Sequence, residues 1–299
     1  MLNIALARQS RTAPQLADAM LLLVAVIWGS SYAATKQALA FYPVLGFIAL
    51  RFTLTFLVLV PQLRGAGLTA LRPGLPLGLI LLGVFICETQ GVAIISAGNA
   101  AFLISLFVIF TPLVEWLVCR GRLDVRLMLA ALLSLLGVYW LCGGSALRLG
   151  RGEWLVIAAA LLRACLVCYT RRLTAQRPVP ALALTAVQTG VVAAGSWLLL
   201  LFTFRQPPPL PASWQFWGIT LYLALFATLF AFFAQNYAAG RTSPSRLSLL
   251  LGTEPLFGAL LAALLLNEHL TALGWLGGGC IVASLLMVLT RRTPPQQVP

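Results

Sequence analysis

The chain has 299 residues, of which 61% are hydrophobic and 9% are charged, and its mean hydropathy is +0.96. A soluble domain is roughly 45–50% apolar and about 25% charged, so this composition excludes an ordinary soluble enzyme and a disordered chain. The formal net charge is +13. The basic residues lie between apolar blocks rather than on one face, which argues against a nucleic-acid-binding protein. The composition therefore predicts a protein that crosses the lipid bilayer many times.

Ten apolar blocks follow one another along the chain, each close to the length of about 20 residues that a helix needs to cross a bilayer. The blocks are continuous rather than alternating, which favours helices over the strands of a barrel. Glycine, proline and arginine mark the turns between them. We expect membrane-spanning helices at about residues 17–37, 44–63, 75–96, 98–119, 126–143, 154–174, 181–204, 214–238, 245–266 and 271–290.

Basic residues in the short connecting segments predict the orientation, because Lys and Arg gather on the cytoplasmic side of a membrane. With the N-terminus inside, the inner segments hold 14 Lys and Arg residues. The outer segments hold only Lys36, Arg148, Arg151 and Arg205. We therefore expect a multi-pass protein of the cytoplasmic (inner) cell membrane with both termini in the cytoplasm.

A linker at residues 143–152 divides the chain into two halves with five expected spans each. Shifting the fourth and fifth blocks by 147 residues places them on the ninth and tenth, with the joining turn in register. Five is an odd number, so the second half must insert upside down. Inverted repeats of this kind are typical of transporters that bind their substrate near the middle of the membrane. We expect two repeats, residues 1–146 and 147–299.

Several short motifs occur in order along nearly the whole chain. They are Trp28-Gly29-Ser30-Ser31 with Lys36, Leu50-Arg51-Phe52, Asn99-Ala100-Ala101-Phe102-Leu103, Tyr169-Thr170-Arg171-Arg172-Leu173, Glu254-Pro255 and Asn267-Glu268-His269-Leu270. With these motifs the chain resembles the EamA branch of the drug/metabolite transporter superfamily, which includes amino-acid exporters. The resemblance implies an all-α fold of ten transmembrane helices in two inverted five-helix repeats. It also implies transport of small metabolites, often as export.

The chain departs from the pattern of that family in two places. At the 147-residue offset, Val108 stands opposite Pro255 and Gly121 stands opposite Glu268, so the first half lacks this proline and acid. Arg163 lies where the family usually has an apolar or small residue. Both departures leave the substrate class open.

Four charged residues lie near the middle of expected spans: Arg51, Glu88, Arg163 and Glu254. A charge at the bilayer centre costs about 2.5–3.5 kcal/mol on insertion scales, so it usually marks a function or a partner. Each arginine either bonds to helix carbonyls or a glutamate, or binds a substrate carboxylate with its forked guanidinium. Glu254, just before Pro255, either stabilises a kink or holds a coupling proton or a substrate ammonium. Glu88 has the same functional alternatives, or pairs with an arginine.

Aromatic and polar residues also mark possible cavity walls. Trp28, Ser31, Tyr32 and Thr35 share one face of the first expected helix, which suits a wet cavity, with helix packing as the alternative. Asn99 either caps the fourth helix or reaches the cavity. The eighth span carries an aromatic stripe that packs against lipid and helices or forms a further wall: Tyr222, Phe226, Phe230, Phe233 and Tyr237.

Motifs for other chemistries are missing from the sequence. Cys165 and Cys168 form a C-x-x-C in the middle of an expected helix without a second pair, and His269 is the only histidine, so we expect no metal site. The sequence has no phosphate loop and no G-x-S-x-G motif. We therefore expect no cofactor, no ATP-driven step and no enzymatic activity.

The sequence predicts a secondary active transporter. We expect an exporter of amino acids or related zwitterions that works by alternating access, because the four central charges balance. A nucleotide-sugar or triose-phosphate exchanger and a cationic drug exporter are alternatives within the superfamily. A membrane-embedded enzyme and a channel are alternatives of other classes. Expected partners are a small-molecule substrate and the bilayer, without nucleic acid, in a monomer or weak homodimer. The expected substrate-binding residues are Trp28, Ser31, Tyr32, Arg51, Glu88, Asn99, Arg163, Phe230 and Glu254, with Glu254 or Glu88 as the coupling-proton site.

Overall fold

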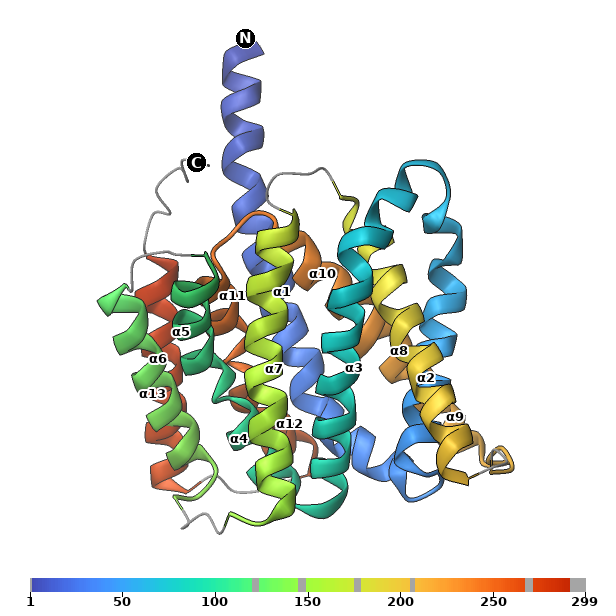
Figure 1. Cartoon of the computed structure of the whole chain (residues 1–299). Coiled ribbons are helices and arrows are strands. Elements are labelled where there is room, and N and C mark those ends of the chain that lie inside the picture. Colours follow the sequence, from blue (N-terminus) through green and yellow to red (C-terminus); the bar gives the residue numbers. More distant parts are fainter. Residues whose placement is uncertain are drawn as a thin grey trace.

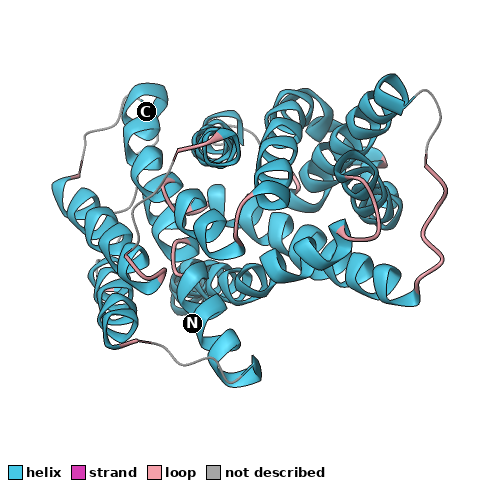
Figure 2. Cartoon of the chain, turned by 90° about the horizontal axis from the view of Figure 1, so that it is seen from below, coloured by secondary structure: helices cyan, strands magenta, loops and turns pink. Residues whose placement is uncertain are grey.

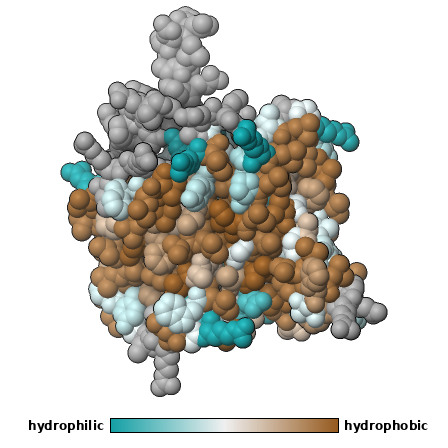
Figure 3. All heavy atoms as spheres, viewed as in Figure 1, coloured by the Kyte–Doolittle hydropathy of each residue, from teal (hydrophilic) through white to brown (hydrophobic). Residues whose placement is uncertain are grey.

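The computed structural model describes residues 2–119, 124–144, 149–174, 179–204, 208–266 and 271–290, and every secondary-structure element in these ranges is a helix. Figures 1 and 2 show the helices packed side by side in one bundle. Apolar residues form a broad band around the face seen in Figure 3, and the hydrophilic residues gather toward its two ends. An apolar belt of this kind suits a protein surrounded by lipid.

Helices occupy all ten predicted blocks. They are α1 (Leu2–Leu39), α2 (Val44–Leu59), α3 (Leu71–Ile94), α4 (Ala97–Ile104), α5 (Phe107–Cys119), α6 (Val125–Leu141), α7 (Arg151–Thr174), α8 (Ala181–Phe204), α9 (Trp214–Ala224), α10 (Ala231–Ala239), α11 (Pro244–Leu251), α12 (Glu254–Leu266) and α13 (Ala272–Leu289). Two 3₁₀ helices (Val60–Leu63 and Gly65–Ala70) follow α2, and a π-helical segment (Leu225–Phe230) joins α9 to α10.

Eight segments are long and apolar enough to cross a membrane: Gln15–Leu39, Val44–Leu63, Gly67–Ile94, Gly98–Val118, Arg151–Thr174, Ala181–Phe204, Trp214–Ala239 and Ala272–Leu289. Of the other two predicted blocks, the fifth holds the shorter helix α6 and the ninth is divided between α11 and α12. The chain is thus an all-helical, multi-pass membrane protein. The predicted junction at residues 267–270 lies outside the described residues.

Several helices differ from the predicted blocks for local reasons. Helix α1 begins far before residue 17 and projects beyond the bundle in Figure 1. The fourth block breaks between α4 and α5, where the Ser105 hydroxyl donates to the Ala101 carbonyl (2.7 Å) and competes with the backbone ladder. The ninth block breaks before Glu254 because Pro255 has no N–H to donate to the carbonyl four residues earlier.

The broken helices of the two halves have the same bounds when they are shifted by 147 residues. The starts of α4, α5 and α6 then fall on the starts of α11, α12 and α13. The N-caps also coincide. The hydroxyls of Ser96 and Ser243 each accept the backbone N–H of the residue three positions later. Asp124, the N-cap of α6, corresponds to Thr271, the N-cap of α13. The equal block lengths read from the sequence therefore extend to the positions of the helix breaks and caps.

Small residues allow some of the helices to approach closely. Gly137 of α6 faces Gly277 of α13, and a Cβ on Gly137 would lie 2.6 Å from the Gly277 carbonyl oxygen. Gly29 of α1 faces Gly258 of α12 in the same way, with a Cβ on Gly29 lying 2.6 Å from the Gly258 nitrogen. The second contact matters for function because it holds Trp28 and Glu254 on neighbouring helices.

We expect Gly137→Ala to destabilise the protein by about 1–3 kcal/mol, because the added methyl overpacks a contact between two backbones. Thermal unfolding of the detergent-purified protein measures the effect as a lowered Tm. Gly279→Ala is the matched control, since a Cβ on this α13 residue meets nothing within 4 Å. Equal Tm values for the two variants would contradict close α6–α13 packing.

Candidate functional site

A pocket in the middle of the bundle gathers side chains from six helices. The space between the lining atoms, open solvent included, is about 550 Å³. Seven of the nine expected binding residues line it. The lining residues are Trp28, Ser31, Tyr32, Thr35, Arg51, Leu81, Val84, Phe85, Glu88, Thr89, Val92, Arg163, Leu166, Phe232 and Glu254.

Two residues that line the pocket, Arg163 of α7 and Glu254 of α12, form an ion pair. Arg163 Nη2 lies 3.4 Å from Glu254 Oε2, and both residues are buried, with 6% and 3% of their surfaces exposed. The Arg163 guanidinium also lies over the rings of Trp28 (4.2 Å to the centroid) and Phe107 (4.5 Å). Removing either charge would leave the other uncompensated, which is strongly destabilising in a buried setting.

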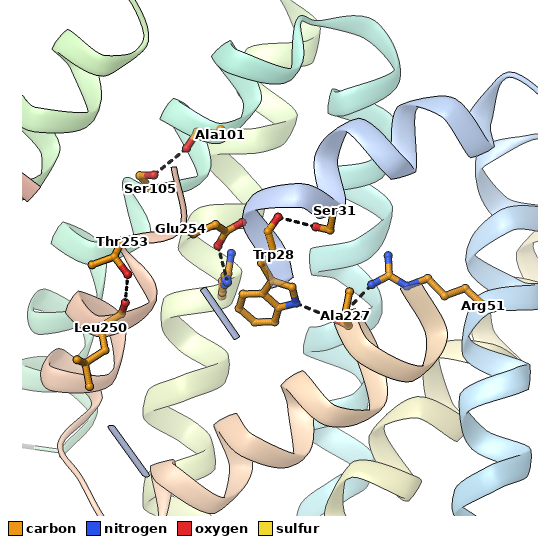
Figure 4. Close-up of polar contacts among 10 residues, drawn as sticks. Trp28, Ser31, Arg51, Ala101, Ser105, Ala227, Leu250, Thr253 and Glu254 are labelled. Carbon is orange, nitrogen blue, oxygen red and sulfur yellow. Dashed lines mark hydrogen bonds and ion pairs between the residues drawn. The ribbon is translucent and has the colours of Figure 1, made fainter. Parts of the chain in front are cut away.

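Glu254 is the first residue of α12, directly after the break that separates α12 from α11 (Figure 4). The backbone N–H groups at the start of a helix have no partners within the helix, and its dipole favours negative charge. The break therefore gives the carboxylate a favourable position in addition to Arg163. Glu254 also lines the pocket. A role at the helix break is therefore compatible with a role in binding a proton or a substrate.

Arg51 of α2 is bonded to the irregular part of the eighth block. Its Nε donates to Thr228 Oγ1 (2.7 Å) and its Nη2 donates to the Ala227 carbonyl (3.3 Å). The indole Nε1 of Trp28 donates to the same carbonyl (2.8 Å), as Figure 4 shows. Arg51 is thus bonded to a helix carbonyl, which was one of the two expectations for it, and its side chain also lines the pocket.

Glu88 and Tyr32 contribute polar atoms that are less firmly bonded than those of Arg51. Within the described ranges, no Lys or Arg nitrogen lies within 4.0 Å of the Glu88 carboxylate. The Tyr32 hydroxyl is buried and faces the carboxylates of Glu88 and Glu254, and within the described residues none of its contacts has the full geometry of a hydrogen bond. Buried polar groups normally have partners, so these two groups suit a ligand or water in the pocket.

Two expected site residues do not line the pocket. Asn99 is exposed in the first turn of α4, and its backbone N–H donates to the Ser96 hydroxyl, so Ser96 and not Asn99 is the cap. Phe230 is half-buried at the end of the π-helical segment, and Phe232 takes the position in the pocket wall. The wider π turn shifts the register of the helix, which the α-helical spacing of the aromatic stripe does not reveal.

Helix α1 enters the bundle at one end, which we call the N-terminal face (Figure 1). Polar contacts on this face join the two halves of the chain. Arg246 Nη2 of α11 lies 2.7 Å from Asp18 Oδ2 of α1, and Arg246 Nη1 donates to the Val288 carbonyl (2.6 Å). The Glu115 carboxylate of α5 accepts the Ser245 N–H (2.9 Å) and the Ser245 hydroxyl. The pocket lies beyond these contacts, extending to Thr35 and Val92 near the opposite ends of α1 and α3.

Comparison with known proteins agrees with this architecture. A protein from Archaeoglobus fulgidus named "Uncharacterized transporter" is 27% identical over 92% of this chain and 86% of its own length. A protein from Salmonella typhimurium named "Probable amino-acid metabolite efflux pump" is 27% identical over 88% of this chain and 91% of its own. An "Uncharacterized inner membrane transporter" from Escherichia coli is 27% identical over 88% of this chain and 87% of its own length.

A solved structure, titled "Crystal structure of protein", has the same fold. Its TM-score is 0.74 at 19% identity, and the similarity covers 92% of this chain and 96% of that chain. The model of the EamA-like transporter family matches residues 15–143 and again residues 150–290. The chain therefore belongs to the EamA-like transporter family of the drug/metabolite transporter superfamily, and it is a multi-pass membrane transporter.

Proposed function

We propose that the chain is a secondary active transporter that exports amino acids or related zwitterions across the cytoplasmic membrane by alternating access. The observation that carries this proposal is the pocket, which holds two arginines and two glutamates in balance. A site for a cationic drug would favour surplus acid, and a site for a phosphate ester would favour surplus base. The relative from Salmonella that is named an amino-acid metabolite efflux pump supports the same substrate class.

We further propose ten transmembrane helices in two inverted repeats, residues 1–146 and 147–299, with both termini in the cytoplasm. The family model matches the chain twice, and the starts of α4, α5 and α6 coincide with those of α11, α12 and α13 at one offset. The distribution of basic residues supports the orientation. With this topology the N-terminal face is the cytoplasmic face.

Different parts of the pocket suit the two charged ends of a zwitterion. Arg51 is already bonded to Thr228 and Ala227, whereas Arg163 has one hydrogen bond of 3.4 Å among the described residues and further N–H groups for a carboxylate. Glu88 has no ion pair in the described structure and, with Tyr32, can accept a substrate ammonium. Trp28, Phe85 and Phe232 supply apolar walls.

The Arg163–Glu254 pair offers a route for coupling to protons. A proton on Glu254 would cancel the charge that holds the Arg163 guanidinium and release it toward a substrate carboxylate. Glu88 is the second candidate for the coupling proton, because it lines the same pocket without an ion pair among the described residues. In either case the proton and the substrate carboxylate act on one network of charges.

Alternating access would break the contacts on the N-terminal face. Asp18–Arg246 and Glu115–Ser245 each join a helix of the first repeat to α11 of the second. In the present conformation these contacts lie on the N-terminal face, and the lining of the pocket reaches Thr35 and Val92 toward the opposite face. We infer that the conformation is outward-facing and that rocking of the repeats separates these pairs.

We expect purified protein in liposomes loaded with unlabelled amino acids to take up labelled amino acids in saturable counterflow. Glu254→Gln should lower this uptake at least tenfold, because it leaves Arg163 as an uncompensated buried charge. Glu254→Asp, which keeps the charge, should retain more uptake than Glu254→Gln, and Glu153→Gln, outside the pocket, should match the wild type. Movement of a cationic dye or a nucleotide sugar without amino-acid counterflow would refute the proposed substrate class.

We expect Arg163→Lys to raise the half-saturation concentration for amino acids at least tenfold, because a lysine cannot bind a carboxylate with two parallel bonds. Competition by the matching amine, which lacks the carboxylate, should change little. Arg51→Lys should instead lower the Tm, since it loses the bond from Nε to Thr228. If Arg163→Lys weakens amine and amino acid equally, the guanidinium does not bind the carboxylate.

A further inference from the structure

A cluster of uncharged polar side chains is buried between α8 and α10, away from the charges of the pocket. Asn236 Nδ2 donates to Thr185 Oγ1 (2.9 Å) and to Gln188 Oε1 (2.7 Å). These three residues and the neighbouring Gln235 are at most 5% exposed. The bonds from Asn236 thus connect two helices through amide and hydroxyl groups alone.

Three amide atoms of this cluster have no hydrogen-bond partner within the described part of the chain. They are the Gln188 Nε2 donor and the Gln235 Oε1 and Asn236 Oδ1 acceptors. Leaving a buried polar atom without a partner costs more than the bond itself would contribute, because the atom has lost its water. Buried polar atoms normally have partners, so three such atoms suit a solute or a water that reaches them.

The cluster lies between the pocket and the N-terminal face. Phe232 lines the pocket, and Gln235 and Asn236 follow it by three and four residues, so they lie on the same face of α10 one turn farther on. Thr185 and Gln188 lie in the first two turns of α8, which begins at the N-terminal face (Figure 1). At the end of α10, Arg171 Nη1 donates to the Gly240 carbonyl (2.6 Å).

We propose that Gln188, Gln235 and Asn236 form a second, uncharged binding site on the transport path, which holds the polar ends of the solute when the N-terminal face opens. The proposal rests on the transport function proposed above. The free donor of Gln188 suits a carboxylate, and the free acceptors of Gln235 and Asn236 suit an ammonium. Because the amides carry no net charge, they can receive a zwitterion from Arg163 and Glu88 without holding it as tightly.

The accessibility of a single cysteine tests whether the cluster lies on the path. In a chain whose six native cysteines are replaced by alanine, Gln188→Cys should react with a membrane-impermeant methanethiosulfonate applied to the N-terminal face. Ser284→Cys is the matched control: Ser284 is 1% exposed in α13, and its hydroxyl bonds to Ile281 of the same helix. We expect Gln188→Cys to react at least ten times faster than this control.

Adding Asp18→Asn, which removes the charge that pairs with Arg246, should accelerate the labelling of Gln188→Cys further and leave Ser284→Cys unchanged. Labelling of Gln188→Cys at the rate of Ser284→Cys, with and without Asp18→Asn, would overturn the proposal. This readout does not depend on the identity of the substrate. It therefore separates a failure of the second, uncharged site from a failure of the proposed amino-acid export.

Gln188→Met in the otherwise native chain tests binding and needs no cysteine replacement. The substitution keeps the length of the side chain but removes its unpartnered N–H groups together with the Oε1 that accepts the Asn236 N–H. A purely structural role predicts a lowered Tm with unchanged counterflow for equal amounts of folded protein. We expect a lowered Tm and at least fivefold slower amino-acid counterflow for equal amounts of folded protein, and unchanged counterflow would overturn binding by the amide.

Discussion

Lipid offers no hydrogen bonds, so a helix that is interrupted inside a membrane must find partners for its free backbone groups within the protein. The eighth block shows how this constraint builds the site. Its π-helical segment leaves the Ala227 carbonyl accessible to side chains, and both Trp28 of α1 and Arg51 of α2 donate to it. Thr55 of α2 bonds to the Ala224 carbonyl just before the segment (3.0 Å). The irregular backbone is therefore the reason that an arginine and a tryptophan from two other helices converge at the pocket wall.

The charged residues of the pocket differ in how many partners they have within the protein. Arg51 is held by the π-helical segment, and Arg163 and Glu254 hold one another across α7 and α12, beside the Trp28 ring. Within the described residues, Glu88 has no ion pair and the Tyr32 hydroxyl has no hydrogen bond of full geometry, so both suit partners among the contents of the pocket. Together with the unpartnered amides between α8 and α10, they place unsatisfied polar atoms at two depths of the bundle. We interpret this series as the polar side of a path that is closed on the N-terminal face by Asp18 and Arg246.

Much of this arrangement could be predicted from single stretches of sequence. The apolar blocks are helical because a run of about 20 apolar residues has few alternatives in a membrane. The shared face of Trp28, Ser31, Tyr32 and Thr35 follows from the period of the α-helix, and all four line the pocket. Asn99 and Phe230 show where such reasoning stops. The cap of α4 is Ser96, a neighbour with an equally suitable side chain, and the π turn before Phe232 changes a register that the sequence pattern counts as regular.

The sequence by itself determined the helical class, the division into two similar halves and the presence of four charges inside apolar blocks, since each is a property of local composition or spacing. Only the tertiary structure decided what those charges do. Arg163 pairs with Glu254, 91 residues away, and Arg51 bonds to Thr228, 177 residues away. Such partners depend on which faces of distant helices meet. At the crossing of α1 and α12, that in turn depends on glycines that let the two backbones approach.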